Sequence, residues 1–162
     1  MELFKSEQYI KEHRAETIEK MCVFAQTDLL MFWSDNPDVY AIERKIWQPF
    51  IDLLQNEIKE SFNISNSLQV PNNDKCILKL KEKLQAFTDK ELTVAFLTAL
   101  QTKSVILGMS LLNRNITTDK IFEAAFLEDI YQNKQWGVDE EALQKREQTK
   151  YELQKLKEYL KK

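Results

Sequence analysis

The sequence predicts an all-α fold, a single compact bundle of about five to six helices that forms one domain over residues 1–162. The chain holds only 2 Gly and 3 Pro, whereas sheets of this size need many such residues to reverse their strands. Apolar residues recur every three or four positions over long stretches, as in helices with one buried face. With 43% hydrophobic and 30% charged residues, the chain belongs with globular proteins and not with disordered ones.

Two helices are expected in the first part of the chain. One apolar stripe predicts a helix over residues 6–33, and it comprises Ile18, Cys22, Ala25, Leu29 and Phe32. Asn36 as a cap and Pro37 at the first helical position begin the next helix. Its apolar face comprises Tyr40, Trp47, Ile51, Leu54, Ile58 and Phe62. Pro49 removes a backbone donor inside this helix, so we expect a kink or short break there.

A loop and two helices follow. Residues 63–74 collect Asn, Ser and Pro and are expected to form the longest irregular segment. A short helix is expected over residues 77–87. Thr88 and Glu91 then match a capping box, which starts a new helix over about residues 88–113. This helix is apolar nearly all round, so we expect it to be the buried central element of the bundle.

The carboxy-terminal part predicts two more helices. A fifth helix over residues 119–133 is expected to end near Gly137, because glycine readily adopts the positive φ that terminates helices. The last helix, over residues 139–162, is highly charged. Its thin apolar seam comprises Ala142, Leu153, Leu156 and Leu160. We expect it to project from the bundle or to pack on a partner.

Composition excludes several kinds of partner. The net charge of −3 is mild and both signs are interspersed, so no basic stripe is present to bind nucleic acid or acidic lipid. Lys103 lies in the middle of the apolar helix, where burial in lipid would be costly, so we expect no membrane insertion. The amino terminus shows no targeting segment. We therefore expect a cytoplasmic protein in a bacterium, or a mitochondrial matrix protein in a eukaryote.

No catalytic or cofactor site is expected. Gly108 and Gly137 stand alone, so the chain has no glycine-rich phosphate loop. Cys22 and Cys76 lie far from each other and from His13, so metal-ligand and redox spacings are absent. His13 lies in a polar neighbourhood typical of a solvated face. The predicted protein is therefore not an enzyme, and it requires no metal and no cofactor.

Seven residues are the candidates for binding a partner: Asp28, Lys103, Ser104, Glu128, Gln132, Trp136 and Gly137. Asp28 interrupts an apolar run, so it is either a charge at the helix edge, a structural anchor or a partner contact. Glu128 and Gln132 share one sector of the fifth helix beside apolar residues, although a solvated glutamate would give the same pattern. Trp136 at the helix end either fills the core or anchors an interface. The Lys-Ser pair is either a solvent-facing patch or a polar contact.

Four short segments carry a resemblance to a known family. They are TDLL at residues 27–30, WQPF at 47–50, KSVI at 103–106, and LEDIYQ at 127–132 followed by WG at 136–137. In this order and spacing they resemble the carboxy-terminal helical domain of the chaperones that assemble the alpha subunit of the F-type ATP synthase, the assembly factor two or ATP12 family. The last segment is the most specific of the four.

The resemblance implies an ATP-independent chaperone, monomeric when free, that binds unassembled alpha subunit and shields the surface that the beta subunit later occupies. It also implies that four of the candidates contribute to the client-binding region or hold it in shape, namely Glu128, Gln132, Trp136 and Asp28. The strand-rich domain that precedes this part in family members is expected to be absent. A helical interaction or adaptor module with another client is the alternative, and a small helical enzyme is the third hypothesis.

Overall fold

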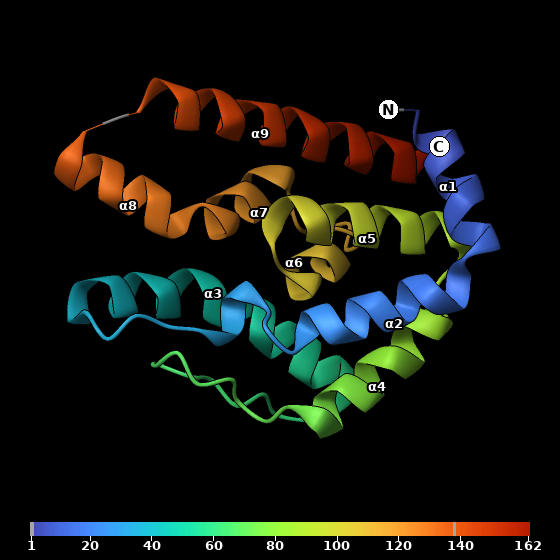
Figure 1. The fold of residues 1–162 in the computed structure, drawn as a ribbon, viewed down its shortest axis with the longest axis horizontal. Helices are drawn as coiled ribbons and strands as arrows, with labels where there is room; N and C mark the ends of the chain where they lie inside the picture. Colours follow the sequence, from blue (N-terminus) through green and yellow to red (C-terminus); the bar gives the residue numbers. More distant parts are fainter. Residues whose placement is uncertain (1, 138) are drawn as a thin grey trace.

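The computed structural model describes residues 2–137 and 139–162, and over these residues it contains nine α-helices and one 3-10 helix. Figure 1 shows them arranged around a short central pair of helices. Their bounds are α1 Leu3–Glu12, α2 Arg14–Ala25, η1 Leu29–Met31, α3 Pro37–Ile58, α4 Asp74–Gln85, α5 Asp89–Thr102, α6 Val105–Ser110, α7 Thr118–Ala125, α8 Leu127–Trp136 and α9 Glu140–Lys161. The prediction of an all-α fold is confirmed. Among the described residues, one isolated β-bridge joins Phe32 and Ser65.

The helix number exceeds the predicted five to six because three expected helices are each divided by one or two residues. The helix expected over 6–33 breaks at His13 (φ −120°, ψ 33°) and ends at Ala25. The helix expected over 119–133 breaks at Phe126 (φ −112°, ψ 22°). The central helix expected over 88–113 breaks at Lys103, whose φ is 62°. Apolar residues continue on both sides of each break, so periodicity alone does not reveal them.

The helix start signals are confirmed. Of the kink or short break expected at Pro49, the break is wrong, and the kink stays a prediction. The Asn36 side chain accepts hydrogen bonds from the backbone N–H groups of Asp38 and Val39, and α3 then runs through Pro49 to Ile58. The capping box at the start of α5 is formed in both directions. The buried positions of α3 are Val39, Glu43, Trp47, Phe50, Ile51, Leu54 and Ile58.

The central element is a hairpin of α5 and α6. α5 contacts α1, α2, α7 and α9 as well as α6, and all residues of α6 are buried. A Cβ atom at Gly108 would lie 2.4 Å from the carbonyl oxygen of Ala95. Only glycine therefore lets the two helices approach this closely.

The charged helix α9 packs along the bundle and does not project from it. It contacts α5 and α7, and Figure 1 shows it lying across one side of the molecule from α8 to α1. Tyr159 Oη donates a hydrogen bond to Glu7 Oε1 of α1 at 2.6 Å. The predicted seam is confirmed at Leu153 and Leu156, whereas Ala142 is exposed. The buried positions of α9 are Arg146, Thr149, Leu153 and Leu156.

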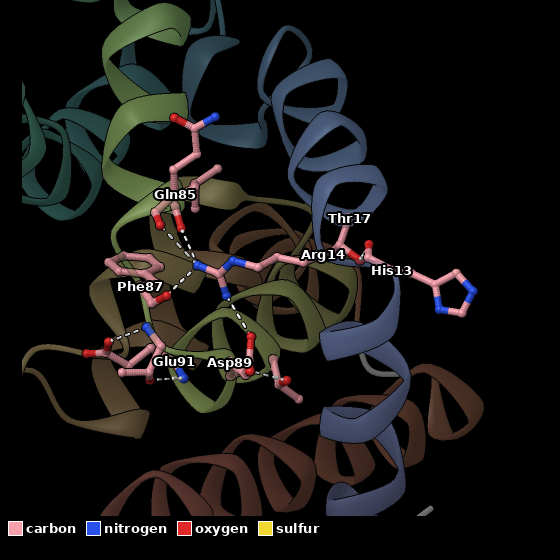
Figure 2. A network of polar contacts seen from close by, with 10 residues as sticks. His13, Arg14, Thr17, Gln85, Phe87, Asp89 and Glu91 are labelled. Carbon is pink, nitrogen blue, oxygen red and sulfur yellow. Dashed lines mark hydrogen bonds and ion pairs between the residues drawn. The ribbon is translucent and has the colours of Figure 1, made fainter.

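Arg14 joins α2 to the end of α4 and the start of α5 (Figure 2). Arg14 at the start of α2 donates to Asp89 Oδ1 at 2.8 Å. Its second nitrogen donates to the carbonyl oxygen of Gln85 at 3.1 Å and to that of Phe87. The Gln85 carbonyl lies in the last turn of α4 and the Phe87 carbonyl just beyond it, where carbonyl groups lack helical partners. Arg14 therefore caps α4 and fixes the link to α5.

Candidate functional site

A groove of about 600 Å³ lies between α8, the segment 32–36 and the loop around Leu68. α8 contributes Glu128, Tyr131, Gln132 and Trp136 to its lining. In Figure 1, α8 and the start of α3 lie at the same end of the molecule. The structure thus brings three of the seven sequence-predicted candidates, Glu128, Gln132 and Trp136, into one site.

The wall formed by residues 32–36 is held by hydrogen bonds on both sides. The Trp33 N–H donates to the carbonyl oxygen of Ser65 at 2.8 Å, and the Ser65 N–H donates to that of Met31 at 2.8 Å. The Trp33 indole N–H donates to the carbonyl oxygen of Leu30 at 2.9 Å. The Ser34 N–H donates to Glu43 Oε1 at 2.7 Å. This irregular segment is therefore fixed without belonging to a helix or sheet.

The opposite wall is positioned through Trp47. Its indole N–H donates to the carbonyl oxygen of Ala124, near the end of α7, at 2.8 Å. The chain turns at Phe126, and α8 begins with the buried Leu127. Glu128 is the next residue, and its exposed side chain lines the groove. α3 therefore sets the place of both walls.

Glu43 is a site residue that the sequence analysis missed. It is fully buried, with 0% of its surface exposed, and its Oε2 atom has no hydrogen-bond donor among the described residues. Burial and then the neighbouring Glu128 carboxyl raise the pKa of Glu43 to about 7, against the lowering effect of the Ser34 N–H. One signal was available, since Glu43 lies four residues before Trp47 on the stripe that α3 buries.

Asp28 and Ser104 lie in a buried junction outside the groove lining. Asp28 Oδ1 accepts from the Leu30 N–H at 3.0 Å, and Oδ2 accepts from the Ile106 N–H at 3.1 Å. Ser104 Oγ accepts from the Leu107 N–H at 3.0 Å and so caps α6. Burial raises the pKa of Asp28 to about 6, against the lowering effect of hydrogen bonds from the Leu30 N–H, the Ser104 hydroxyl and the first N–H groups of α6.

Asp28 is therefore a structural anchor and not a charge at a helix edge, since 1% of its surface is exposed. It caps η1 and ties it to the start of α6. The chain continues from η1 directly into Phe32 and the groove wall. Lys103 adopts the left-handed backbone at the same junction, and its side chain is exposed.

Trp136 does not fill the core, because 86% of its surface is exposed. It is the last residue of α8, and it lines the groove. Gly137 follows with a φ of 95°, which confirms the predicted use of glycine to end this helix. An exposed indole beside a groove is the kind of side chain that anchors protein interfaces.

Other features of the described part of the chain that bear on function concern metal binding, membrane spanning, the cysteines and His13. No group of three His, Cys, Asp or Glu side chains in residues 2–137 and 139–162 is placed to hold a metal ion. None of the helices described is both long and apolar enough to pass through a membrane. Cys22 and Cys76 are buried free thiols, and burial raises the pKa of each. His13 stacks on Tyr9, and its Nδ1 lies 2.8 Å from the Tyr9 carbonyl oxygen.

Comparison with known proteins identifies similar solved structures. No protein-family model matches the sequence, and no curated protein sequence matches it. Atp12 from Paracoccus denitrificans superposes with a TM-score of 0.87 at 20% identity, over 93% of this chain and 66% of that one. The Atu1473 protein from Agrobacterium tumefaciens, described as a candidate chaperone, gives 0.85 at 22% identity, over 94% and 58%.

An aspartate-to-lysine variant of the Paracoccus protein also matches, with a TM-score of 0.86 at 21% identity, over 93% of this chain and 65% of that one. The likeness shows that these proteins share the fold of this chain. The chain spans less than two thirds of the length of each of the three.

Proposed function

We propose that this chain is an assembly chaperone of the F-type ATP synthase, in the ATP12 family, and that it binds the unassembled alpha subunit. Two independent findings support this proposal. The four sequence segments resemble that family, and the fold matches Atp12 from Paracoccus denitrificans over 93% of this chain. The two findings are independent because the resemblance of the segments is read from the sequence, whereas the fold comparison uses the backbone and no motif.

One observation carries the proposal furthest, because the four segments are distant in sequence and join in space. Asp28 of the first segment accepts the N–H of Ile106 from the third, 78 residues away. Trp47 of the second segment bonds the end of α7, just before the fourth segment begins. The fourth segment forms one wall of the groove. These contacts link residues of the four segments to the groove or to the elements that carry its walls, and this supports the proposal.

The groove has the features that a client-binding site needs. Its lining includes Phe32, Tyr131 and the exposed Trp136 together with the acidic Glu128. An unassembled subunit exposes an apolar interface that would otherwise aggregate, and a folded surface with aromatic anchors can cover it. Release requires only a partner that binds the subunit more tightly, so this function needs no nucleotide.

Co-expression with the alpha subunit of the same organism tests the proposal. We expect wild-type protein to raise the amount of soluble alpha subunit and to co-purify with it. Glu128→Lys reverses the charge in the groove and should reduce both readouts. Glu158→Lys reverses an exposed charge on α9, outside the groove, and serves as the matched control. An unchanged amount of soluble alpha subunit with no co-purification rejects the proposal.

The second candidate is a helical interaction module with a different client. It is favoured by one observation, that the exposed indole of Trp136 beside the groove suits an interface with other proteins as well. Preferential binding of the beta subunit, or of an unrelated protein, over the alpha subunit in the same experiment would select this alternative.

A further inference from the structure

The groove carries negative charge that no neighbouring cation balances. Asp35 and Glu128 line it, and its lining includes no Lys, Arg or His. Glu43 lies behind Glu128 and interacts with it. Two carboxyl groups from two parts of the chain thus line a single opening between α8 and the segment 32–36, and a third is buried behind one of them.

Glu43 has an unused hydrogen-bonding atom in this site. Its Oε1 accepts from the Ser34 N–H at 2.7 Å, whereas its buried Oε2 has no donor among the described residues. A buried carboxylate oxygen without a donor is costly, and such atoms in folded proteins call for a partner that completes them. Burial and the neighbouring Glu128 carboxyl let Glu43 keep its proton up to a pH of about 7. A cation with N–H donors can take the place of that proton and neutralise both carboxylates.

The groove walls favour one cation over others. Phe32, Tyr131 and Trp136 are among the lining residues, and a planar guanidinium stacks on aromatic rings while donating to carboxylates at its edge. Its five N–H donors can bond two carboxyl groups at once, which the compact lysine ammonium does less well. A divalent metal would need more ligands than these carboxyls offer, and no third metal-ligating side chain joins the pair in the described residues.

We propose that an arginine side chain of the client enters this groove and that its guanidinium bridges Glu128 and the free Oε2 of Glu43. Glu128 is an exposed side chain, so a change of its rotamer opens the way to Oε2. Glu43 thereby has a double role, holding the groove wall through Ser34 and recognising the client through its second oxygen. This inference rests on the function proposed above and names the chemical group that the site selects.

The first test measures how tightly variants of this protein bind the alpha subunit. Glu43→Gln and Glu128→Gln keep side-chain size and remove one charge each, and Glu158→Gln on α9 is the control. We expect each groove variant to bind alpha subunit about tenfold more weakly, the usual effect of losing a charged hydrogen bond. Equal binding by wild type and both groove variants overturns the inference and leaves the proposed function standing. Failure of the wild type to bind rejects the proposed function itself.

A small-molecule titration tests the recognition chemistry without a client. The probes are N-acetyl-arginine amide, its neutral isostere N-acetyl-citrulline amide, and N-acetyl-lysine amide. Binding is followed by NMR at the indole N–H signals of Trp33 and Trp136, which line the groove. We expect saturable shifts with the arginine probe, weaker ones with lysine and none with citrulline, and loss of the arginine response in Glu43→Gln. Equal responses to arginine and citrulline or to arginine and lysine, or an unchanged response in Glu43→Gln, overturn the inference.

Discussion

Replacing Glu43 by glutamine should stabilise the protein at alkaline pH and do little in acid. The amide keeps the shape of the side chain, its oxygen still accepts from the Ser34 N–H, and its NH2 group supplies a donor toward Glu128. The pKa of Glu43 is raised from 4.5 to about 7 in the folded chain. Folding therefore favours the protonated form, and the contribution of Glu43 to stability is complete below pH 4.5 and lost as pH rises through 7.

The size of the effect follows from that difference in pKa. At about 1.4 kcal/mol per pH unit, the raised pKa of Glu43 lowers the free energy of unfolding by about 3 kcal/mol at pH 8 and about 1 kcal/mol at pH 5, relative to a side chain that stays neutral. Glu43→Gln should exceed wild type by these amounts. For a chain of this length, about 3 kcal/mol raises the unfolding midpoint by roughly 6–12 °C.

Urea denaturation followed by circular dichroism at pH 5 and pH 8 measures this directly. Glu128→Gln is the second arm, because removing the neighbouring carboxyl should lower the pKa of Glu43 and flatten the pH dependence of stability. The reasoning is refuted if Glu43→Gln gains the same stability at both pH values, or none at pH 8. The same variant should bind the client less well, so stability and binding would change in opposite directions.

Three further substitutions test the supports of the fold, each by urea denaturation against wild type. Asp28→Asn should lose about 2 kcal/mol of stability, because one carboxylate oxygen that accepts a hydrogen bond from a buried N–H is replaced by an NH2 group that cannot accept it. Equal stability would contradict the anchor role. Gly108→Ala should lose at least about 2 kcal/mol, since its Cβ would lie 2.4 Å from the Ala95 carbonyl oxygen. A midpoint within error of wild type would show that α5 and α6 separate freely. Arg14→Ala should lose about 2 kcal/mol through the bonds to Asp89 and to the carbonyls of Gln85 and Phe87. Arg14→Lys should recover only part, and full recovery would mean that charge alone matters.

Local signals in the sequence predicted much of the fold. Asn36 and Thr88 cap helices as expected, because capping depends on residues at most three positions away. The breaks at Lys103 and Phe126 were missed because they depend on packing between helices. Lys103 is not a residue type that favours positive φ, so only the bond from the Leu29 N–H to its carbonyl reveals why it turns there.

The candidate site was predicted in part for the same reason. Glu128 and Gln132 follow one another at helical spacing, so their common face was predicted. Trp136 was expected beyond the end of that helix, whereas it is the last residue of α8. The opposite wall was not, because residues 32–36 reach α8 only through tertiary contacts. Glu43 lies on a stripe that the sequence displays, yet its pairing with Glu128 across 85 positions (128 − 43) depends on the fold.

The packing of the last helix against the middle of the chain bears on how this protein is synthesised. α5 receives side chains from both α1 and α9, so part of its buried face stays uncovered until Glu140–Lys161 has left the ribosome. During that interval the nascent chain exposes the apolar surface that draws unfinished proteins into aggregates. A protein proposed to guard another against that fate thus passes through the same vulnerable stage while it is being made.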